Sequence, residues 1–412
     1  MRDVKTPRVR RQEPAVRTPT QEKSLRPFRY TASDEDLADL RRRIQATRWP
    51  EKEPVADQSQ GVRLETMQKL ARYWATEYDW RNTEAKLNAL PQFVTEIDGL
   101  DIHFVHVRSK HDNALPLIVT HGWPGSVVEQ LKIVDPLTNP TAHGGTESDA
   151  FDLVIPSIPG YGFSGKPTTT GWDPERIGRA WVTLMKRLGY TRFVAQGGDW
   201  GALITDTMAA MAPPELAGIH LNLPFTVPPE IAKAAQAGEP APSDLSAEER
   251  GAYDQLVFFY KKGLAYAIEM GNRPQTLYGI ADSPIGLAAW FLDHDARSLE
   301  MIARAFDGQR EDLTRDDVLD NITLTWLTNT GISGARIYWE NKSPFFEPHH
   351  VSIPVALSAF PDELYQAPRS WAERAYPKLI YYKKHDKGGH FAAWEQPERL
   401  SEDMREGFRS LR

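Results

Sequence analysis

The chain has 412 residues, with 41% hydrophobic and 25% charged residues, which is ordinary for a soluble globular protein and long enough for one large domain with insertions or for two domains. Its net charge of −7 excludes a broad basic surface for nucleic acid. The absence of cysteine excludes disulfides, thiolate catalysis and cysteine-based zinc sites, and it fits a cytoplasmic protein.

The first 26 residues differ in composition from the rest of the chain. They are rich in Arg, Lys, Pro and Thr, and no apolar stretch follows Arg10 and Arg11. A secretory signal is therefore not expected, and residues 1–26 are predicted to be a disordered basic tail. No apolar run of about 18 residues occurs anywhere in the chain, so no membrane-spanning helix is predicted.

Three helices are predicted next, from apolar residues at helical spacing. The first follows an N-cap at Ser33 or Thr31 and ends before Pro50, because the residue before a proline disfavours helix. The second and third cover residues 62–78 and 80–89.

Short strands begin at residue 93 and alternate with helices. The first two flank Asp98-Gly99, which is a strong hairpin signal. Continuously apolar strands that alternate with helices indicate a mostly parallel sheet covered on both faces. The predicted strands are 93–97, 100–107, 117–120, 151–155, 193–196, 218–223, 353–358 and 379–382, and the predicted helices among them are 172–188, 202–211 and 397–408.

The stretch from about residue 226 to residue 344 breaks this alternation. It is helical in pattern, rich in aromatic residues and divided by proline-marked turns, and it has no clear strand. It is predicted to be a helical insertion in the α/β core.

The segment Gly197-Gly198-Asp199-Trp200-Gly201 lies between an apolar strand and a helix. This is the layout of a nucleophile elbow, with Asp199 where a serine usually stands. A carboxylate that attacks a saturated carbon forms an ester that water can hydrolyse, whereas serine would form a stable ether. An aspartate elbow therefore indicates epoxides or alkyl halides as substrates. The alternative is that Asp199 only caps the following helix.

His390 follows the last predicted strand and precedes the last predicted helix, as the histidine of an elbow enzyme does. Its expected role is general base for the water that hydrolyses the ester. The acid that orients it should follow strand 353–358, where Asp362 and Glu363 both qualify and spacing does not choose between them. Asp386 lies too close to His390 in the same connection.

The loop His121-Gly122-Trp123-Pro124-Gly125 also follows a strand and precedes a predicted helix. In this position a loop supplies one backbone N–H of an oxyanion hole, and the residue after the nucleophile supplies the other. The expected donors are the N–H groups of Trp123 and Trp200, facing the Asp199 carbonyl oxygen. The alternative is a plain tight turn.

In combination these motifs resemble the microsomal-type epoxide hydrolases, a branch of the α/β-hydrolase superfamily with an added N-terminal segment. The resemblance implies an α/β-hydrolase fold and covers about residues 27 to 405. Its motifs are Pro27-Phe28-Arg29 to Arg48-Trp49-Pro50, His121–Ser126, Gly197–Gly201, Asp282–Ala288, Ser358–Glu363 and Gly388–Ala393. The expected division is a tail (1–26), an N-terminal extension (27–95), the first part of the core (96–225), a helical lid (226–345) and the second part of the core (346–412).

The resemblance also selects residues that spacing leaves open. It favours Glu363 over Asp362, and it places two lid tyrosines, Tyr266 and Tyr338, on the epoxide oxygen. A phenol with a pKa near 10 can donate its proton to the alkoxide that forms as the ring opens. The other lid tyrosines, Tyr253, Tyr260 and Tyr278, are expected to serve only in packing.

The expected reaction is hydrolysis of an apolar epoxide to a vicinal diol, with water as co-substrate. The chain lacks the apolar anchor helix of the membrane-bound members, so a soluble relative is expected, with no nucleic-acid partner and with a homodimer left open. No cofactor or metal is expected, because the histidines lack a His-x-x-x-His spacing with an acidic partner. The alternatives are a haloalkane dehalogenase on the same fold or a catalytically silent binding protein.

Overall fold

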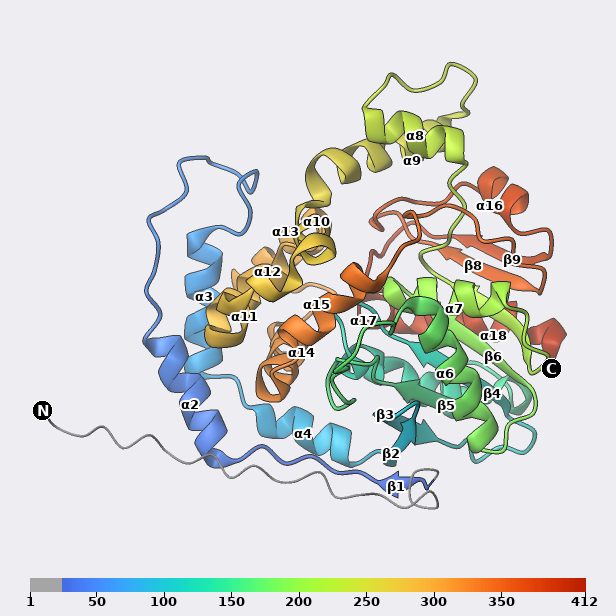
Figure 1. Cartoon of the computed structure of the whole chain (residues 1–412), viewed down its shortest axis with the longest axis horizontal. Coiled ribbons are helices and arrows are strands. Elements are labelled where there is room, and N and C mark those ends of the chain that lie inside the picture. Colours follow the sequence, from blue (N-terminus) through green and yellow to red (C-terminus); the bar gives the residue numbers. More distant parts are fainter. Residues whose placement is uncertain (1–23) are drawn as a thin grey trace, which may run out of the picture.

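The computed structural model describes residues 24–412 and contains a sheet with the strand order β1-β2-β3-β5-β4-β6-β7-β8-β9 (Figure 1). Neighbouring strands from β5 to β9 run parallel, while β1, β2 and β3 are antiparallel. The predicted mostly parallel sheet is confirmed. The strands are β1 (Arg26–Pro27), β2 (Gln92–Ile97), β3 (Leu100–Val107), β4 (Leu115–Thr120), β5 (Phe151–Pro156), β6 (Phe193–Gly197), β7 (Leu216–Leu221), β8 (Val355–Ala359) and β9 (Leu379–Lys384).

The predicted tail, residues 1–26, lies almost wholly outside the described residues. Arg26, the last residue of the predicted tail, belongs to β1 and pairs with Val94. The β2–β3 hairpin is as predicted: Asp98 and Gly99 have φ values of 52° and 79°. A two-residue turn with positive φ at both positions matches the twist of the paired strands.

Helices cover both faces of the sheet, as predicted. On one face, α6 (Pro174–Arg187) packs on α7 (Trp200–Ala210), and α7 contacts β4, β6 and β7. On the other face, α18 (Pro397–Gly407) contacts β8, β9 and α5 (Val134–Thr138) (Figure 1). The loop after β4 leads into a 3₁₀ helix, η1 (Val127–Ile133), rather than directly into an α-helix.

The insertion between β7 and β8 is helical throughout, as predicted, and forms the lid. A short π-helix, η4 (Phe259–Gly263), joins two of its helices. The lid helices are α8 (Pro229–Ala237), α9 (Ala247–Phe258), α10 (Ala265–Asn272), α11 (Tyr278–Asp282), α12 (Pro284–Leu292), α13 (Ala296–Phe306), α14 (Arg315–Thr328) and α15 (Gly331–Glu340).

The N-terminal segment contributes α2 (Asp34–Gln45), α3 (Leu64–Thr76) and α4 (Trp80–Asn88). Ser33, rather than Thr31, caps the first of these, because its side chain accepts a hydrogen bond from the Asp36 N–H at 3.0 Å. This helix ends at Gln45, earlier than the proline-based prediction.

The N-terminal helices lie against the lid (Figure 1). Both α2 and α3 contact α12, α3 also contacts α13, and α4 contacts α14. Two buried hydrogen bonds fix this contact: Trp74 Nε1 donates to Thr323 Oγ1 at 3.0 Å, and Tyr78 Oη donates to Asp320 Oδ1 at 2.7 Å. The N-terminal segment and α14, which lie about 240 residues apart in sequence, are therefore held together.

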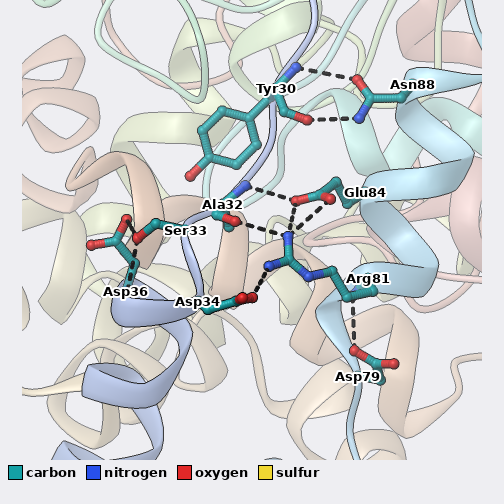
Figure 2. Close-up of polar contacts among 9 residues, drawn as sticks. All are labelled: Tyr30, Ala32, Ser33, Asp34, Asp36, Asp79, Arg81, Glu84 and Asn88. Carbon is teal, nitrogen blue, oxygen red and sulfur yellow. Dashed lines mark hydrogen bonds and ion pairs between the residues drawn. The ribbon is translucent and has the colours of Figure 1, made fainter.

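Figure 2 shows how the extended residues before α2 are fastened to α4. The Glu84 carboxylate accepts a hydrogen bond from the Ala32 N–H at 2.7 Å and from Arg81 at 2.9 Å. Arg81 also donates to the Ala32 carbonyl at 2.8 Å. Because the Glu84 side chain is only 11% exposed, this network is largely shielded from water.

We predict that Glu84→Ala destabilises the fold, because it leaves the buried Ala32 N–H without an acceptor and Arg81 without the more buried of its two carboxylate partners. The expected loss is about 2–3 kcal/mol, which lowers the thermal unfolding midpoint by about 2–4 °C in a chain of this size. The control is Glu373→Ala, which breaks the exposed Arg369–Glu373 pair and should change the midpoint very little. Equal midpoints for the two variants would contradict the prediction.

Candidate active site

Asp199 lies at the sharp turn between β6 and α7. Its φ of 50° and ψ of −127° are strained for a residue with a side chain. The turn brings backbones very close together, since a Cβ added at Gly201 would overlap the Thr120 carbonyl and one at Gly122 would overlap the Asp199 carboxylate. The glycines therefore permit the turn that projects Asp199 above the sheet.

Four connections bring their residues to the same edge of the sheet. The strands β4, β6, β8 and β9 are parallel, so their carboxyl ends face the same way. Trp123, Asp199, Glu363 and His390 follow these strands in that order. The topology thus gathers residues that are up to 267 positions apart, from Trp123 to His390.

The His390 ring connects two carboxylates. Its Nδ1 lies 2.6 Å from Glu363 Oε1, and its Nε2 lies 3.4 Å from Asp199 Oδ2. The structure places Glu363 on the histidine, whereas the Asp362 side chain is 51% exposed and faces Arg297 at 3.7 Å. Asp386 is exposed as well and pairs with an arginine of α18.

The charges of this group depend on one another. Burial alone would raise the pKa of Asp199, but His294 and His390 together lower it below its usual range. Burial opposes charge on His390, yet the Glu363 and Asp199 carboxylates raise its pKa well above the usual value. These interactions favour an ionised Asp199 beside a protonated His390.

One of the two predicted oxyanion donors is hydrogen-bonded to Asp199. The Trp123 N–H donates to Asp199 Oδ1 at 2.7 Å. Within residues 24–412, no hydrogen bond runs from the Trp200 N–H to that carboxylate. Trp200 is the first residue of α7, so its N–H still belongs to the positive end of that helix.

Tyr266, from α10, and Tyr338, from α15, reach into the site from the lid. Both are buried, and their ring centroids are 6.0 Å apart. The Trp123 ring stacks on Tyr266 at 4.9 Å and meets Tyr338 edge-on at 5.7 Å. Burial raises the pKa of both phenols well above the usual value, so both can donate a proton at neutral pH.

The other three lid tyrosines differ in their surroundings. Tyr253 donates to the backbone carbonyl of Glu239 at 2.8 Å, and Tyr278 is 66% exposed. Tyr260 packs on Phe259. The cavity above the nucleophile is lined mainly by apolar side chains: Asp199, Trp200, Leu203, Leu223, Phe225, Phe259, Tyr266, Tyr338, Phe345, Phe346 and Leu364.

A second histidine, which sequence reasoning missed, also faces the nucleophile. His294 follows α12, and its Nδ1 lies 2.9 Å from Asp295 Oδ2. Its Nε2 lies 3.9 Å from Asp199 Oδ2, and its ring centroid is 4.2 Å from that of His390. The adjacent His-Asp pair was the one local signal, but only the packing of the lid brings it to Asp199. Asp199, His294 and His390 could together hold a metal ion, since one ligand atom of each lies within 4.8 Å of the others.

Two further buried acids lie near this group and were not predicted. Glu129, on η1, is buried against Gly125, and burial raises its pKa to about 8. Glu395 accepts a hydrogen bond from the Phe391 N–H at 2.9 Å, and burial raises its pKa to about 7. The site is therefore rich in carboxyl groups, some of them neutral.

Two protein-family models match the chain: residues 25–130 match the epoxide hydrolase N terminus, and residues 116–256 match the alpha/beta hydrolase fold. The chain is 50% identical over 396 residues to a putative epoxide hydrolase of Stigmatella aurantiaca, which covers 94% of this chain and 86% of that protein. It is 35% identical over 407 residues to epoxide hydrolase 1 of Oryctolagus cuniculus, covering 93% and 88%.

Solved structures are similar over nearly the whole chain. The crystal structure of juvenile hormone epoxide hydrolase from the silkworm Bombyx mori matches with a TM-score of 0.83 and 30% identity, covering 95% of this chain and 96% of that one. The Aspergillus niger epoxide hydrolase matches with a TM-score of 0.80 and 31% identity, covering 96% and 99%. Of the helices described here, none combines the length and apolar character needed to cross a membrane.

We predict that Glu129→Gln changes the pH dependence of stability. Burial raises the pKa of Glu129 to about 8 in the folded chain, from an ordinary value of 4.5. The stability that its neutral form contributes is therefore complete below pH 4.5 and is lost as the pH rises through 8. Glutamine cannot ionise. The free energy of unfolding of the variant, relative to that of the wild type, should therefore rise by about 2–4 kcal/mol between pH 5 and pH 9.

Thermal unfolding midpoints of both proteins across this pH range test the prediction. The exposed Glu373→Gln change is the control, because its midpoint should run parallel to that of the wild type. Parallel curves for Glu129→Gln as well would show that Glu129 is ionised in the folded chain.

Proposed function

The chain belongs to the microsomal-type epoxide hydrolase family of the α/β-hydrolase fold, and we propose that Asp199, His390, Glu363, Tyr266 and Tyr338 carry its reaction. It is an epoxide hydrolase, which adds water to an epoxide and yields a vicinal diol. The observation that supports these residues is their convergence: a carboxylate on a strained elbow lies 3.4 Å from a His–Glu pair and beneath two buried phenols.

In the first step, Asp199 forms a bond to one carbon of the epoxide ring. The Trp123 N–H holds Oδ1, so Oδ2 is the oxygen left to attack. The carbon–oxygen bond of the ring breaks as the new ester bond forms, and the epoxide oxygen takes a proton from Tyr266 or Tyr338. Because the carboxylate is already ionised, this step needs no base.

In the second step, His390 accepts a proton from water, and the resulting hydroxide attacks the carbonyl carbon of the ester. Negative charge then develops on Oδ1, where the Trp123 N–H stabilises it. We propose that the second donor, the Trp200 N–H, forms its hydrogen bond to Oδ1 only when this negative charge develops. As the intermediate collapses, the ester bond breaks and the hydroxyl proton of the intermediate passes to the departing oxygen. This releases the diol and leaves one water oxygen in the Asp199 carboxylate.

Ester formation itself prepares the base for the second step. The Glu363 and Asp199 carboxylates together raise the pKa of His390 in the free enzyme. Alkylation removes the charge of Asp199, so the pKa of His390 falls when the ester forms, and its proton passes to the tyrosinate that the first step leaves. The neutral imidazole, which can accept a proton, is thereby favoured at the stage where it is needed.

The apolar lining of the cavity supports an apolar epoxide as substrate. All five proposed residues come from one chain, so the reaction requires no second copy, although a homodimer is compatible with it. We also propose the division into an extension (27–95), a core (96–225 and 346–412) and a lid (226–345), together with a cytoplasmic location, which cell fractionation would test.

The covalent step is tested by a single turnover of styrene oxide in ¹⁸O-labelled water. We expect the label to enter the protein first, in the peptide that contains Asp199, and to reach the diol only in later turnovers. Asp199→Asn should abolish turnover, apart from slow conversion back to aspartate. Labelled diol in the first turnover would contradict the proposal. In His390→Gln the ester should persist, and intact-protein mass spectrometry should show its mass.

We predict that Tyr266→Phe and Tyr338→Phe each slow ester formation by about 10–100-fold, because one proton donor to the ring oxygen is lost. The double variant should lose more than about 10³-fold, since neither phenol remains. The control is Tyr278→Phe in the exposed part of the lid, which should match the wild type. Rapid-quench mass spectrometry of the adduct measures the rate, and a wild-type rate in the double variant would contradict the roles of both tyrosines.

A further inference from the structure

Two histidines approach the same oxygen of Asp199. The Nε2 of His390 lies 3.4 Å from Oδ2, and the Nε2 of His294 lies 3.9 Å from it. Both rings are only 1% exposed, and both Nε2 atoms lack a hydrogen-bond partner among residues 24–412. Two buried nitrogen atoms are therefore aimed at one carboxylate oxygen.

These distances are close to those of a metal site. Zinc binds imidazole nitrogen and carboxylate oxygen at about 2.0–2.2 Å, so ligand atoms around a tetrahedral ion lie about 3.4 Å apart. The His390–Asp199 distance already has this value. The His294–Asp199 distance exceeds it by about 0.5 Å, and the three ligand atoms all lie within 4.8 Å of one another.

The outer partners of the three side chains also match a metal site. Nδ1 of His390 contacts Glu363 at 2.6 Å, and Nδ1 of His294 contacts Asp295 at 2.9 Å. Histidine ligands in metal sites usually donate their other N–H to a carboxylate, which fixes the tautomer and aims the free nitrogen at the ion. The Trp123 N–H holds the other oxygen of Asp199, so Oδ2 remains for the ion.

A cleft lies next to one of the three side chains, His294. It has a volume of about 460 Å³. Its acidic lining, which faces one arginine, Arg297, favours the entry of a cation. The acidic residues of the lining are Asp254, Asp295, Glu300, Asp362 and Glu363.

We propose that Asp199, His294 and His390 bind one divalent transition-metal ion, for which Zn²⁺ is the best match, and that the bound ion blocks the active site reversibly. Two nitrogen atoms and one oxygen suit zinc, and a fourth position remains for water. His390 binds the ion as the neutral imidazole, so the proton that it carries in the free enzyme is released. Binding itself does not depend on the reaction of the enzyme. The block of turnover rests on the proposed function, because the ion occupies both the nucleophile and the base.

Direct binding to the full-length, chelator-treated protein tests the site without any epoxide. Calorimetric titration with Zn²⁺ should show one ion per chain, and titration with Co²⁺ should give the visible absorption of a low-symmetry, roughly tetrahedral ion. His294→Gln should weaken Zn²⁺ binding at least tenfold. Asp295→Asn keeps the ring but removes its carboxylate partner and should weaken binding about 10–100-fold.

The matched control is His349→Gln. His349 also contacts a carboxylate through Nδ1, with Asp206 at 2.6 Å, and its Nε2 also lacks a partner within the described residues, yet no second histidine faces it. This variant should bind Zn²⁺ as the wild type does. If circular dichroism shows that His294→Gln is unfolded, Asp295→Asn decides the question.

Two results would overturn the proposal. One is the absence of stoichiometric binding at a Zn²⁺ concentration of roughly 100 µM, which is taken as the weakest relevant Kd. The other is Zn²⁺ binding that both His294→Gln and Asp295→Asn leave unchanged. The consequence for turnover is measured separately. Diol formation from styrene oxide should fall as Zn²⁺ is added and return with chelator. A protein that binds zinc through His294 but turns over no epoxide would support the site and contradict the proposed function.

Discussion

The buried charge of Asp199 is the constraint on which the rest of the site depends. A carboxylate removed from water is costly unless hydrogen bonds and opposite charge compensate it. Here the Trp123 N–H holds one oxygen, and His390 and His294 face the other. Each histidine in turn needs its own carboxylate, so the site is built as an alternating chain of acids and imidazoles that extends from the elbow to Glu363 and Asp295.

The lid completes this site, and the N-terminal helices hold the lid. Tyr266 and Tyr338 come from α10 and α15, which contact each other, while α2, α3 and α4 pack on α12, α13 and α14. Buried hydrogen bonds such as that from Trp74 to Thr323 connect the two layers. The phenols above Asp199 are thus linked through the lid to the N-terminal helices, and in the proposed mechanism these helices help to position the two proton donors.

The arrangement that suits ester hydrolysis also suits a metal ion, for the same reason. A general base needs a free nitrogen lone pair whose direction is fixed from behind by a carboxylate, and a zinc ligand needs the same. In the proposed reaction one such histidine, His390, serves Asp199 as the general base. The second, His294, completes the proposed set of three metal ligands with Asp199 and His390. Two features of this chain therefore favour metal binding: the His294–Asp295 pair after α12 and the acidic cleft beside it.

The sequence by itself determined the local features and their order: a helix cap at Ser33 or Thr31, the Asp98-Gly99 hairpin, the elbow at Asp199 and the helical character of the lid. Short-range periodicity and glycine positions carry that information, because they act within a few residues. Tertiary structure alone brought His294 beside Asp199 and buried Glu129 against Gly125. It also put Glu363 on His390 while Asp362 turned outward, a choice that spacing left open. The approach of His294 to Asp199 arises because the lid folds back over the sheet. The Glu363–His390 contact arises because parallel strands bring their carboxyl ends to one edge of the sheet.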